Sequence, residues 1–312
     1  MTTAAAATIA LDAMGGDHAP TVTVAGALRA RERHDIEVTL VGDPDELTAA
    51  LASAGASHGL PIVAARETVA MDEDPAIAMR AKPDASVRVA ARLVAEGRAS
   101  ALVSAGSTGA TLAAALLEIG RLPGVRRPVL AATIPALAAS PSGQDSGGRQ
   151  VVLVDAGGSP DVQPEGLPAY ARMGAAYARA RGSHAPRVGL LNVGAEAGKG
   201  NGLTRAAFPL LHAVPGFIGN VEPLLVLGGE VDVVVTDGFT GNVFLKTLEA
   251  ACGSVGGRDR SVGAAVLLGV AGEVLVAHGA ADEWQVTAAL RTAARVSNAG
   301  LWRLVEERLS AV

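Results

Sequence analysis

Four short segments of the sequence combine glycines with charged, amide or hydroxyl side chains in patterns suited to binding an anion. The first is Asp12–Pro20, which places two glycines between two carboxylates, with an imidazole and a proline behind them. Glycine lets the backbone approach a ligand closely, and proline suits the first turn of a helix. The segment therefore predicts a strand–loop–helix corner that presents backbone N–H groups, carboxylates and His18 to a ligand.

The second segment, Ser104–Ala110, leads from an apolar run into a predicted helix over 111–119. Backbone N–H groups at a helix start, joined by the hydroxyls of Ser107 and Thr108, suit a phosphate or a carboxylate. The same hydroxyls also suit an ordinary helix N-cap. The residues alone leave both interpretations open.

The third segment, Asn192–Asn201, surrounds Lys199 with glycines. It differs from a nucleotide P-loop, because Gly194 and Gly198 enclose three residues instead of four and Gly200 follows the lysine where serine or threonine is required. A lysine in a glycine-rich loop still suits a phosphate or an oxyanion. An exposed lysine in a plain turn has the same pattern.

The fourth segment, Thr236–Thr247, contains a strand end, two glycines and a predicted helix that starts near Asn242. Asn242 and Lys246 are four residues apart, so they share one face of that helix. For Lys246, a solvated helix position is an equal alternative. His18 and His278 are the two of six histidines that follow predicted strands, and no His, Asp or Glu spacing indicates a metal site.

The elements that position these segments are short β-branched runs separated by helical patterns. Strands are predicted at 8–11, 37–41, 101–103, 129–134, 151–154, 188–191, 217–218, 231–235 and 274–277. A helix is predicted around Val87–Val94, and another over about 283–309. This alternation, with several strands apolar on both faces, predicts one α/β domain with a largely parallel sheet.

Polar residues follow six of the predicted strands. They are Asp12, Ser104, Asp155, Asn192, the pair Thr236–Asp237, and His278. Ligands of open parallel sheets bind outside the carboxyl ends of the strands, so the pattern indicates one converging site. The alternative is that loops are polar in any case. The glycines that accompany almost every one of these residues favour a site.

Composition excludes several classes of function. The net charge is −5, the 26 Lys and Arg residues are scattered and aromatic residues make up 3%, which argues against a nucleic-acid partner. One cysteine, Cys252, excludes an intramolecular disulfide. The N-terminus lacks the basic region of a signal peptide and the apolar stretches are too short to span a bilayer, so we expect a cytoplasmic protein.

Together these segments resemble the phosphate acyltransferase family PlsX. Asp12–Pro20 matches the family's D-A-M-G-G-D-H-A-P, and Ser104–Ala110 resembles S-A-G-N-T-G-A. Residues 190–201 resemble L-L-N-V-G-x-E-x-x-K-G-N, and 231–249 resemble A-D-V-V-V-T-D-G-F-T-G-N-V-x-L-K-T-L-E. The resemblance runs in the same order from about residue 8 to residue 309.

The resemblance implies a three-layer α/β/α fold of the isocitrate dehydrogenase-like and phosphotransacetylase-like type, with a cleft between lobes. It implies transfer of a long acyl chain from acyl carrier protein to inorganic phosphate, for phospholipid synthesis. No cofactor or metal is implied. Catalytic roles are expected for His18, Lys199, Asp237, Asn242, Lys246 and His278. Substrate binding is expected for Asp12, Gly15, Gly16, Asp17, Ser104, Gly106, Ser107, Thr108, Gly109, Asp155, Asn192, Glu196, Gly200, Asn201, Gly238 and Gly241.

Departures from the family pattern keep alternatives open. Ser107 and Ser159 stand where the family has Asn, and Ala280 and Ala281 stand where it has Ser. The stretch 250–262 replaces a longer helical hairpin that the family uses in dimer and membrane contact, which puts a homodimer and peripheral membrane contact in doubt. The alternatives are a phosphotransacylase for short acyl-coenzyme A, or a paralogue that binds carrier protein without turnover.

Overall fold

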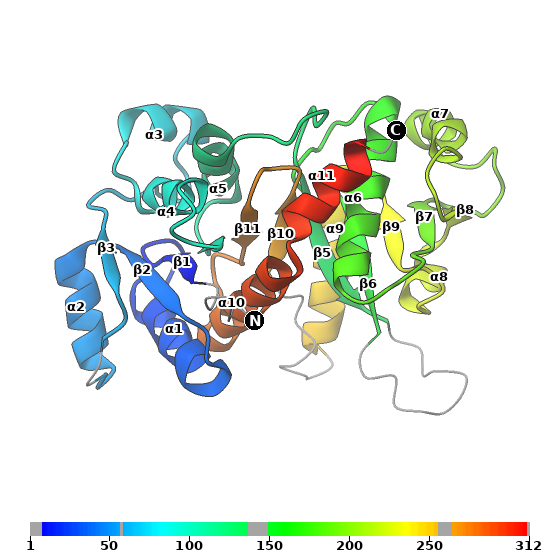
Figure 1. Cartoon of the computed structure of the whole chain (residues 1–312). Helices are drawn as coiled ribbons and strands as arrows, with labels where there is room; N and C mark the ends of the chain where they lie inside the picture. The colour runs from blue at the N-terminus through cyan, green and yellow to red at the C-terminus, as the bar shows by residue number, and fades with distance from the viewer. Residues whose placement is uncertain (1–7, 57–58, 137–148, 255–263, 311–312) are drawn as a thin grey trace, which may run out of the picture. The chain divides into compact units, whose positions relative to one another are not determined.

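The computed structural model describes residues 8–56, 59–136, 149–254 and 264–310. By its internal contacts the chain divides into two compact units. Figure 1 labels the helices and strands of both. Unit 1 comprises the chain up to Arg121 together with Val270–Gly300, and unit 2 comprises Leu122–Gly269 together with the chain from Leu301 on. The predicted single domain of residues 1–312 and its cleft remain predictions.

The sheet of unit 1 is wholly parallel. Its strands lie in the order β3 (Ile62–Ala64), β2 (Val38–Gly42), β1 (Ile9–Asp12), β4 (Ala101–Ser104) and β11 (Glu273–Val276). Asp12 is in register with Ser104, and Ser104 with Val276. The last residues of β1, β4 and β11 therefore reach one edge of the sheet side by side.

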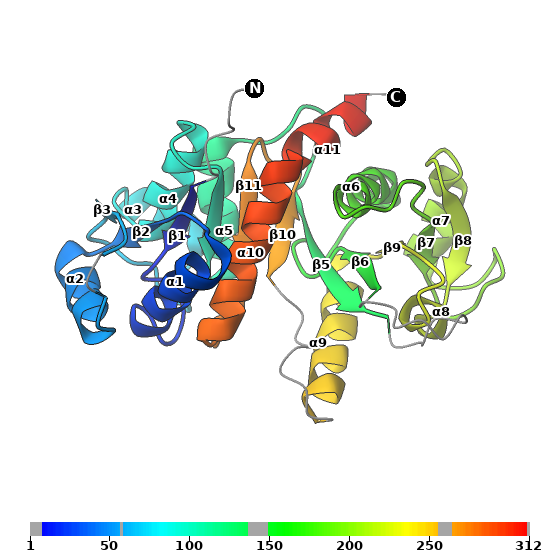
Figure 2. The ribbon, with the colours of Figure 1, turned by 60° about the horizontal axis from the view of Figure 1, so that its bottom comes forward.

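Helices cover both faces of this sheet, as Figure 2 shows. On one face α1 (Thr21–His34) packs against α10 (Glu283–Ala299), next to α2 (Pro44–Ser53). On the other lie α4 (Ser86–Ala95), α3 (Pro75–Ala81) and α5 (Thr108–Ala114), which continues as the π-helix η1 (Ala115–Ile119). Covered on both faces, the strands are apolar on both sides: Ile9, Ala10 and Leu102 are fully buried.

Unit 2 is built around a mixed sheet. Its strands lie in the order β10 (Ala265–Leu268), β5 (Val129–Pro135), β6 (Gln150–Val154), β9 (Val233–Val235), β7 (Val188–Leu191) and β8 (Phe217–Val221). β5 is antiparallel to both neighbours, and the other pairs are parallel. The carboxyl ends of β6, β9 and β7 thus share one edge.

The helices of unit 2 include α6 (Leu167–Ala180), which packs on β6, β9 and α11 (Leu301–Ser310). The others are η2 (Pro164–Gly166), α7 (Gly202–Leu211), α8 (Pro223–Leu227) and α9 (Gly238–Ser254). α6 is buried almost all round because its apolar and small residues face both the sheet and α11. α9 follows β9 directly and carries the fourth polar segment.

The predicted strands are all present, and the α/β class with a largely parallel sheet is confirmed. Two short strands, β3 and β10, were not predicted, since three or four apolar residues give too little periodicity. The helix predicted over about 283–309 is two helices. Gly300, in the left-handed conformation at φ 61°, ends α10 and separates it from α11.

Candidate active site

At the strand-end edge of unit 1, a hydrogen-bond chain joins β1, β4 and the turn after β4. Ser104 Oγ donates to Asp12 Oδ2 at 2.7 Å, and the backbone N–H of Gly106 donates to Ser104 Oγ at 3.0 Å. Both side chains are buried, Asp12 at 2% exposed and Ser104 at 0%. This chain fixes the turn that leads into α5.

Gly15 is required by close contact with that chain. A Cβ at this position would lie 2.5 Å from Asp12 Oδ2 and 2.8 Å from the Gly106 nitrogen, so a larger residue displaces one of them. Gly16 adopts φ 111°, which L side chains rarely adopt. Close contact at Gly15 and the positive φ of Gly16 therefore explain why the loop after β1 has glycine at both positions.

The loop at 15–18 also contacts the loop after β11. The backbone N–H of Asp17 donates to the Gly279 carbonyl at 2.8 Å. His18 and His278 are both exposed, and His278 Nδ1 accepts from the Ala280 N–H at 3.2 Å. Residues from the loops after β1, β4 and β11 are therefore brought together within unit 1.

Burial raises the pKa of the Asp12 carboxyl above its usual value. The hydroxyls of Ser86 and Ser104 and the amides of Met14 and Gly15 lower the pKa, but by less than burial raises it. Of its two oxygens, Oδ1 is buried and has no partner at hydrogen-bonding geometry within the described residues. A buried polar atom without a partner is costly, and it marks a place where a ligand or a proton belongs.

A small pocket lies at this edge. Its walls include Asp12 and four hydroxyl-bearing residues, Ser86, Ser104, Ser107 and Thr111. Ser107 caps α5, with its Oγ accepting from the Ala110 N–H at 3.5 Å. The N-cap interpretation of the second segment is confirmed, and the residue that caps the helix also lines the pocket.

Sequence reasoning missed one wall of the pocket, formed by Val69 and Ser86. They belong to the segment 66–86, whose α3 packs against α5 through Pro75 and Gly109. This segment has two prolines and scattered charged residues, and it gave no motif. The one available signal was the predicted amphipathic helix at Val87–Val94, directly after Ser86.

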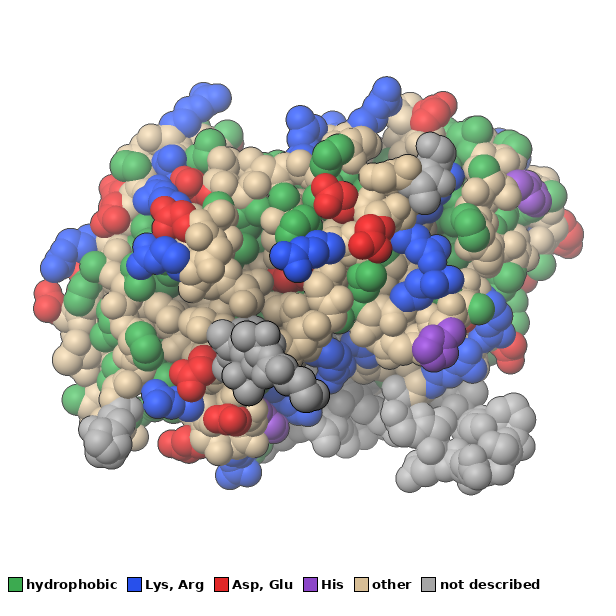
Figure 3. All heavy atoms as spheres, viewed as in Figure 1, with side chains coloured by type: hydrophobic (Ala, Val, Ile, Leu, Met, Phe, Trp, Pro, Cys, Tyr) green, Lys and Arg blue, Asp and Glu red, His purple; other side chains and the backbone are tan. Residues whose placement is uncertain are grey.

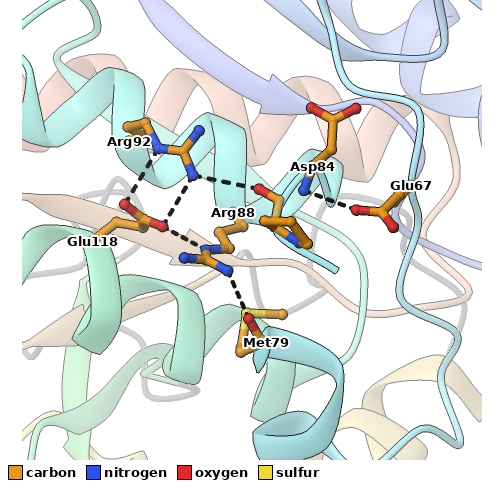
Figure 4. Close-up of polar contacts among 7 residues, drawn as sticks. Glu67, Met79, Asp84, Arg88, Arg92 and Glu118 are labelled. Carbon is orange, nitrogen blue, oxygen red and sulfur yellow. Dashed lines mark hydrogen bonds and ion pairs between the residues drawn. The ribbon is translucent and has the colours of Figure 1, made fainter. Parts of the chain in front are cut away.

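An ion-pair network holds this wall in place (Figure 4). Glu118 on η1 accepts from Arg88 Nε at 2.5 Å and from Arg92 Nη2 at 3.2 Å, both on α4. Arg88 Nη1 also donates to the Met79 carbonyl of α3 at 2.7 Å. Burial raises the pKa of Glu118, but the two guanidinium groups outweigh it and hold the pKa below its usual range.

At the strand-end edge of unit 2, Asp155 organises the loop that follows β6. Its Oδ1 accepts from the N–H groups of Leu130, Gly157 and Gly158 at 3.2, 3.0 and 2.7 Å, and Oδ2 accepts from Ser159 at 2.6 Å. Burial raises the pKa of this fully buried carboxyl, and the N–H groups partly offset the rise. Four backbone donors occupy the carboxylate, so Asp155 shapes the loop.

The loop shaped by Asp155 packs against the start of α9. The Gly238 N–H donates to the Ser159 carbonyl at 2.9 Å, and a Cβ at Gly241 would clash with the Asp155 carbonyl. Asp237 caps α9, accepting from the Thr240 N–H at 2.8 Å. Both predicted glycines of the fourth segment are thus explained by backbone contact.

Asn242 and Lys246 lie on α9, which begins at Gly238, one turn earlier than predicted. A Cβ at Gly157 would lie 2.9 Å from Asn242 Nδ2, so this amide stands against the loop that Asp155 shapes. Lys246 is exposed. Asn242 is therefore held at the strand-end edge, and Lys246 extends into solvent.

The third segment forms a turn between β7 and α7. Asn192 is buried and donates from Nδ2 to the Lys199 carbonyl at 3.1 Å, while Asn201 caps α7. Gly200 adopts φ 99° beside Asn192. Lys199 and Glu196 are exposed, and both lie close to Gly194. The turn presents the lysine to solvent from a fixed backbone.

The six predicted strand-end residues therefore form two groups, one at the edge of each unit. Among the described residues, no group of His, Cys, Asp and Glu could hold a metal ion. Within the same residues, no helix combines the length and apolarity needed to cross a membrane. On the face drawn in Figure 3, basic and acidic side chains are interspersed.

The fold is shared with acyl-transferring enzymes of known structure. The EutD phosphotransacetylase from Staphylococcus aureus has a TM-score of 0.68 at 17% identity, over 93% of this chain and 94% of that one. A branched-chain phosphotransacylase from Enterococcus faecalis V583 has a TM-score of 0.65 at 17% identity, over 93% and 99%. The predicted phosphotransacetylase-like fold is confirmed.

A family model described as a fatty acid synthesis protein matches residues 7–257. The chain is 45% identical to a phosphate acyltransferase of Thermus thermophilus, over 97% of this chain and 99% of the relative. The chain belongs to the phosphate acyltransferase family. The family relative from Desulfitobacterium hafniense (strain Y51) is 42% identical over 96% of this chain and 97% of its own length.

Phosphate acyltransferases of this family include residues that have no counterpart here. The alignment with the Desulfitobacterium relative runs over 334 positions, whereas this chain has 312 residues. The predicted shortening at 250–262 falls largely outside the described residues, because α9 is described to Ser254 and the next described residue is Ala264.

Proposed function

We propose that this protein transfers a long fatty acyl group from acyl carrier protein to inorganic phosphate and releases an acyl phosphate. The observation that carries the proposal is the similarity, along nearly the whole chain, to relatives named phosphate acyltransferase. The strand-end groups of both units supply residues suited to the chemistry.

The reaction needs no protein nucleophile. A phosphate oxygen attacks the thioester carbonyl carbon, the tetrahedral intermediate collapses, and the carbon–sulfur bond breaks. The proton that hydrogen phosphate brings ends on the departing thiol, so atoms and charge balance. The protein must bind and orient the phosphate, stabilise the oxyanion and guide one proton.

Unit 1 supplies a phosphate site in this proposal. The turn Gly106–Gly109 is held by the Asp12–Ser104 chain, and the hydroxyls of Ser107 and Thr108 stand at its end. His18 and His278 are exposed on the two neighbouring loops, where an imidazole relays a proton between phosphate and thiol. Asp17, Gly15 and Gly16 shape these loops.

Unit 2 supplies oxyanion donors in this proposal. Lys199 extends from a turn fixed by Asn192, Gly200 and Asn201, and Asn242 is held against the Gly157 backbone. A donor of this kind is worth about 3 kcal/mol in the transition state of acyl-transfer enzymes. Asp155, Asp237, Gly238 and Gly241 act as positioning residues for Asn242, and Lys246 is the second candidate cation.

The test measures thiol release from palmitoyl-acyl carrier protein and from butyryl-coenzyme A, each with and without phosphate. We expect phosphate-dependent release from the carrier-protein donor, with the acyl phosphate trapped by hydroxylamine. Preference for butyryl-coenzyme A would replace the long-chain assignment with a short-chain phosphotransacylase. Binding of carrier protein without phosphate-dependent release from either donor would leave a non-catalytic paralogue.

Oligomeric state and location follow from the same family assignment and are proposals too. We propose a cytoplasmic enzyme that works on carrier protein and phosphate. A homodimer and contact with a membrane surface depend on the length of the segment after α9. Sedimentation of the purified protein, alone and with phospholipid vesicles, measures both properties directly.

A further inference from the structure

The carboxyl of Asp12 has one oxygen that the described chain leaves without a partner. Asp12 lines the unit 1 pocket, and its Oδ2 accepts the hydroxyl proton of Ser104. Its Oδ1 is buried and unpartnered at hydrogen-bonding geometry within the described residues. A buried carboxylate oxygen is an acceptor, so the group that completes it must bring a proton.

Ser104 cannot bring that proton. A serine hydroxyl has one hydrogen, which goes to Asp12 Oδ2, and its oxygen already accepts from the Gly106 N–H at 3.0 Å. The Ser104 hydroxyl is therefore committed to Oδ2. The Ser86 hydroxyl lines the same pocket and lowers the pKa of Asp12, but it does not reach hydrogen-bonding geometry with Oδ1, which is left for a ligand.

The charged groups on the elements around β1 do not neutralise Asp12. Arg88 and Arg92 of α4 pair with Glu118, as Figure 4 shows, while β2 and β4 carry no charged residue. The charged residues of α10 are Glu283, Arg291 and Arg295, and none of them lines the pocket. An ionised Asp12 repels an anion unless a proton lies between them.

We propose that Asp12 selects the protonated form of a tetrahedral oxyanion, accepting the P–OH of hydrogen phosphate at Oδ1 and rejecting oxyanions that carry no proton. This inference rests on the proposed function, since it assigns the phosphate to unit 1. It makes Asp12 a specificity-determining residue.

The size of the pocket fits this mode of binding. In this structure it has room for about one water-sized group, and it opens to solvent. One protonated oxygen of the phosphate enters it, and the other three stay at the mouth, near Ser107 and the Gly106 backbone. The proton held at Asp12 is the one that the reaction later delivers to the thiol.

The experiment compares phosphate, arsenate and sulfate binding to the whole protein by calorimetry, from about pH 8 to about pH 9.5, which lies above the second ionisation of phosphate, so that phosphate carries one proton. Arsenate has phosphate-like acidity, and sulfate has no proton to offer. We expect phosphate and arsenate to bind alike and sulfate about 10- to 100-fold more weakly. Sulfate binding requires Asp12 to take up a proton, so its affinity falls by about tenfold per pH unit.

Two variants distinguish selection of the protonated oxyanion by Asp12 from positioning of the loop by the hydrogen bond between Asp12 and Ser104. Asp12→Asn keeps a carbonyl oxygen for the Ser104 hydroxyl and replaces the second oxygen by an NH₂ donor. We expect it to bind sulfate at least as well as phosphate, with no pH dependence for sulfate. Ser104→Ala keeps the carboxylate, so it weakens phosphate and arsenate together and leaves sulfate rejected. Thermal melting verifies that each variant folds.

Three outcomes overturn the inference. They are equal affinity of the wild type for sulfate and phosphate, unchanged selectivity in Asp12→Asn, and gain of sulfate binding in Ser104→Ala. The wild-type comparison decides the matter even if Asp12→Asn does not fold. Because binding is measured without an acyl donor, selective phosphate binding with no acyl transfer would contradict the proposed function and leave this inference standing.

Discussion

At the residue scale, two buried aspartates at strand ends, Asp12 and Asp155, have different roles although they occupy similar positions in the fold. Asp155 accepts four backbone N–H groups, so its carboxylate is saturated and acts on the loop at 156–159. Asp12 accepts the Ser104 hydroxyl at Oδ2, and its Oδ1 has no partner at hydrogen-bonding geometry within the described residues. The number of backbone donors around each carboxylate, set by the local turn, makes this difference.

Replacing Asp155 by alanine is expected to destabilise the protein by about 3 kcal/mol or more, because four backbone donors lose their acceptor in a buried loop. Urea unfolding measures the change. Asp161→Ala is the matched control, since Asp161 is an exposed carboxylate two residues beyond the same loop and should change stability little. A loss below about 1 kcal/mol in Asp155→Ala would show that the loop does not depend on this carboxylate.

At the scale of elements, α4 joins the pocket to the rest of unit 1. Its first residue, Ser86, lines the pocket, and Arg88 and Arg92 bind Glu118 of η1. Arg88 also reaches the carbonyl of Met79 at the end of α3. A change at Glu118 of η1 therefore acts on three helices at once, because both of its partners lie on α4 and one of them, Arg88, also binds α3.

Glu118→Gln is expected to lower the free energy of unfolding by about 1–3 kcal/mol near neutral pH, since charge-assisted hydrogen bonds are lost. The lowered pKa of Glu118 sets the pH dependence. The stabilisation is complete above the ordinary glutamate pKa of about 4.3 and is lost as the pH falls through the lowered value. The free energies of unfolding of wild type and variant should therefore become equal at acidic pH.

Denaturant unfolding of both proteins across this pH range checks the prediction. Glu96→Gln provides the comparison, because the Glu96–Arg98 pair is exposed and exposed pairs contribute about 0–1 kcal/mol. If the difference in the free energy of unfolding between wild type and Glu118→Gln stayed constant as the pH falls, the effect would come from packing and not from the charge of Glu118.

At the scale of the whole molecule, each of the two units contributes its own group of polar residues. His18 belongs to unit 1 and Lys199 to unit 2. If both serve one acyl transfer, removal of either must lower turnover although they belong to different units. The family assignment supports one reaction for the whole chain, because the relatives match it from end to end.

His18→Ala and Lys199→Ala are each expected to lower kcat for phosphate-dependent thiol release by about 100-fold, the usual effect of losing a proton relay or an oxyanion donor. His184→Ala, an exposed histidine in a loop of unit 2, should keep wild-type turnover. Steady-state kinetics with palmitoyl-acyl carrier protein measures all three. Unchanged turnover in both His18→Ala and Lys199→Ala would make the assigned roles wrong.

The sequence by itself determined the α/β class, most strand positions and the four polar segments, because apolar periodicity and glycine placement are local properties. It could not reveal β3 and β10 or the pocket wall at Val69 and Ser86. Those depend on which segments pack together across long stretches of chain.

Only the tertiary structure decided which polar residues face a ligand and which hold the backbone. Asp12 and Asp155 follow their strands with similar sequence patterns, yet one keeps an unpartnered oxygen and the other has none. The reason is physical. Three of the four donors to Asp155 come from the turn that follows it, whereas Asp12 receives the Ser104 hydroxyl from a neighbouring strand, and the sequence pattern records neither the turn geometry nor the neighbouring strand.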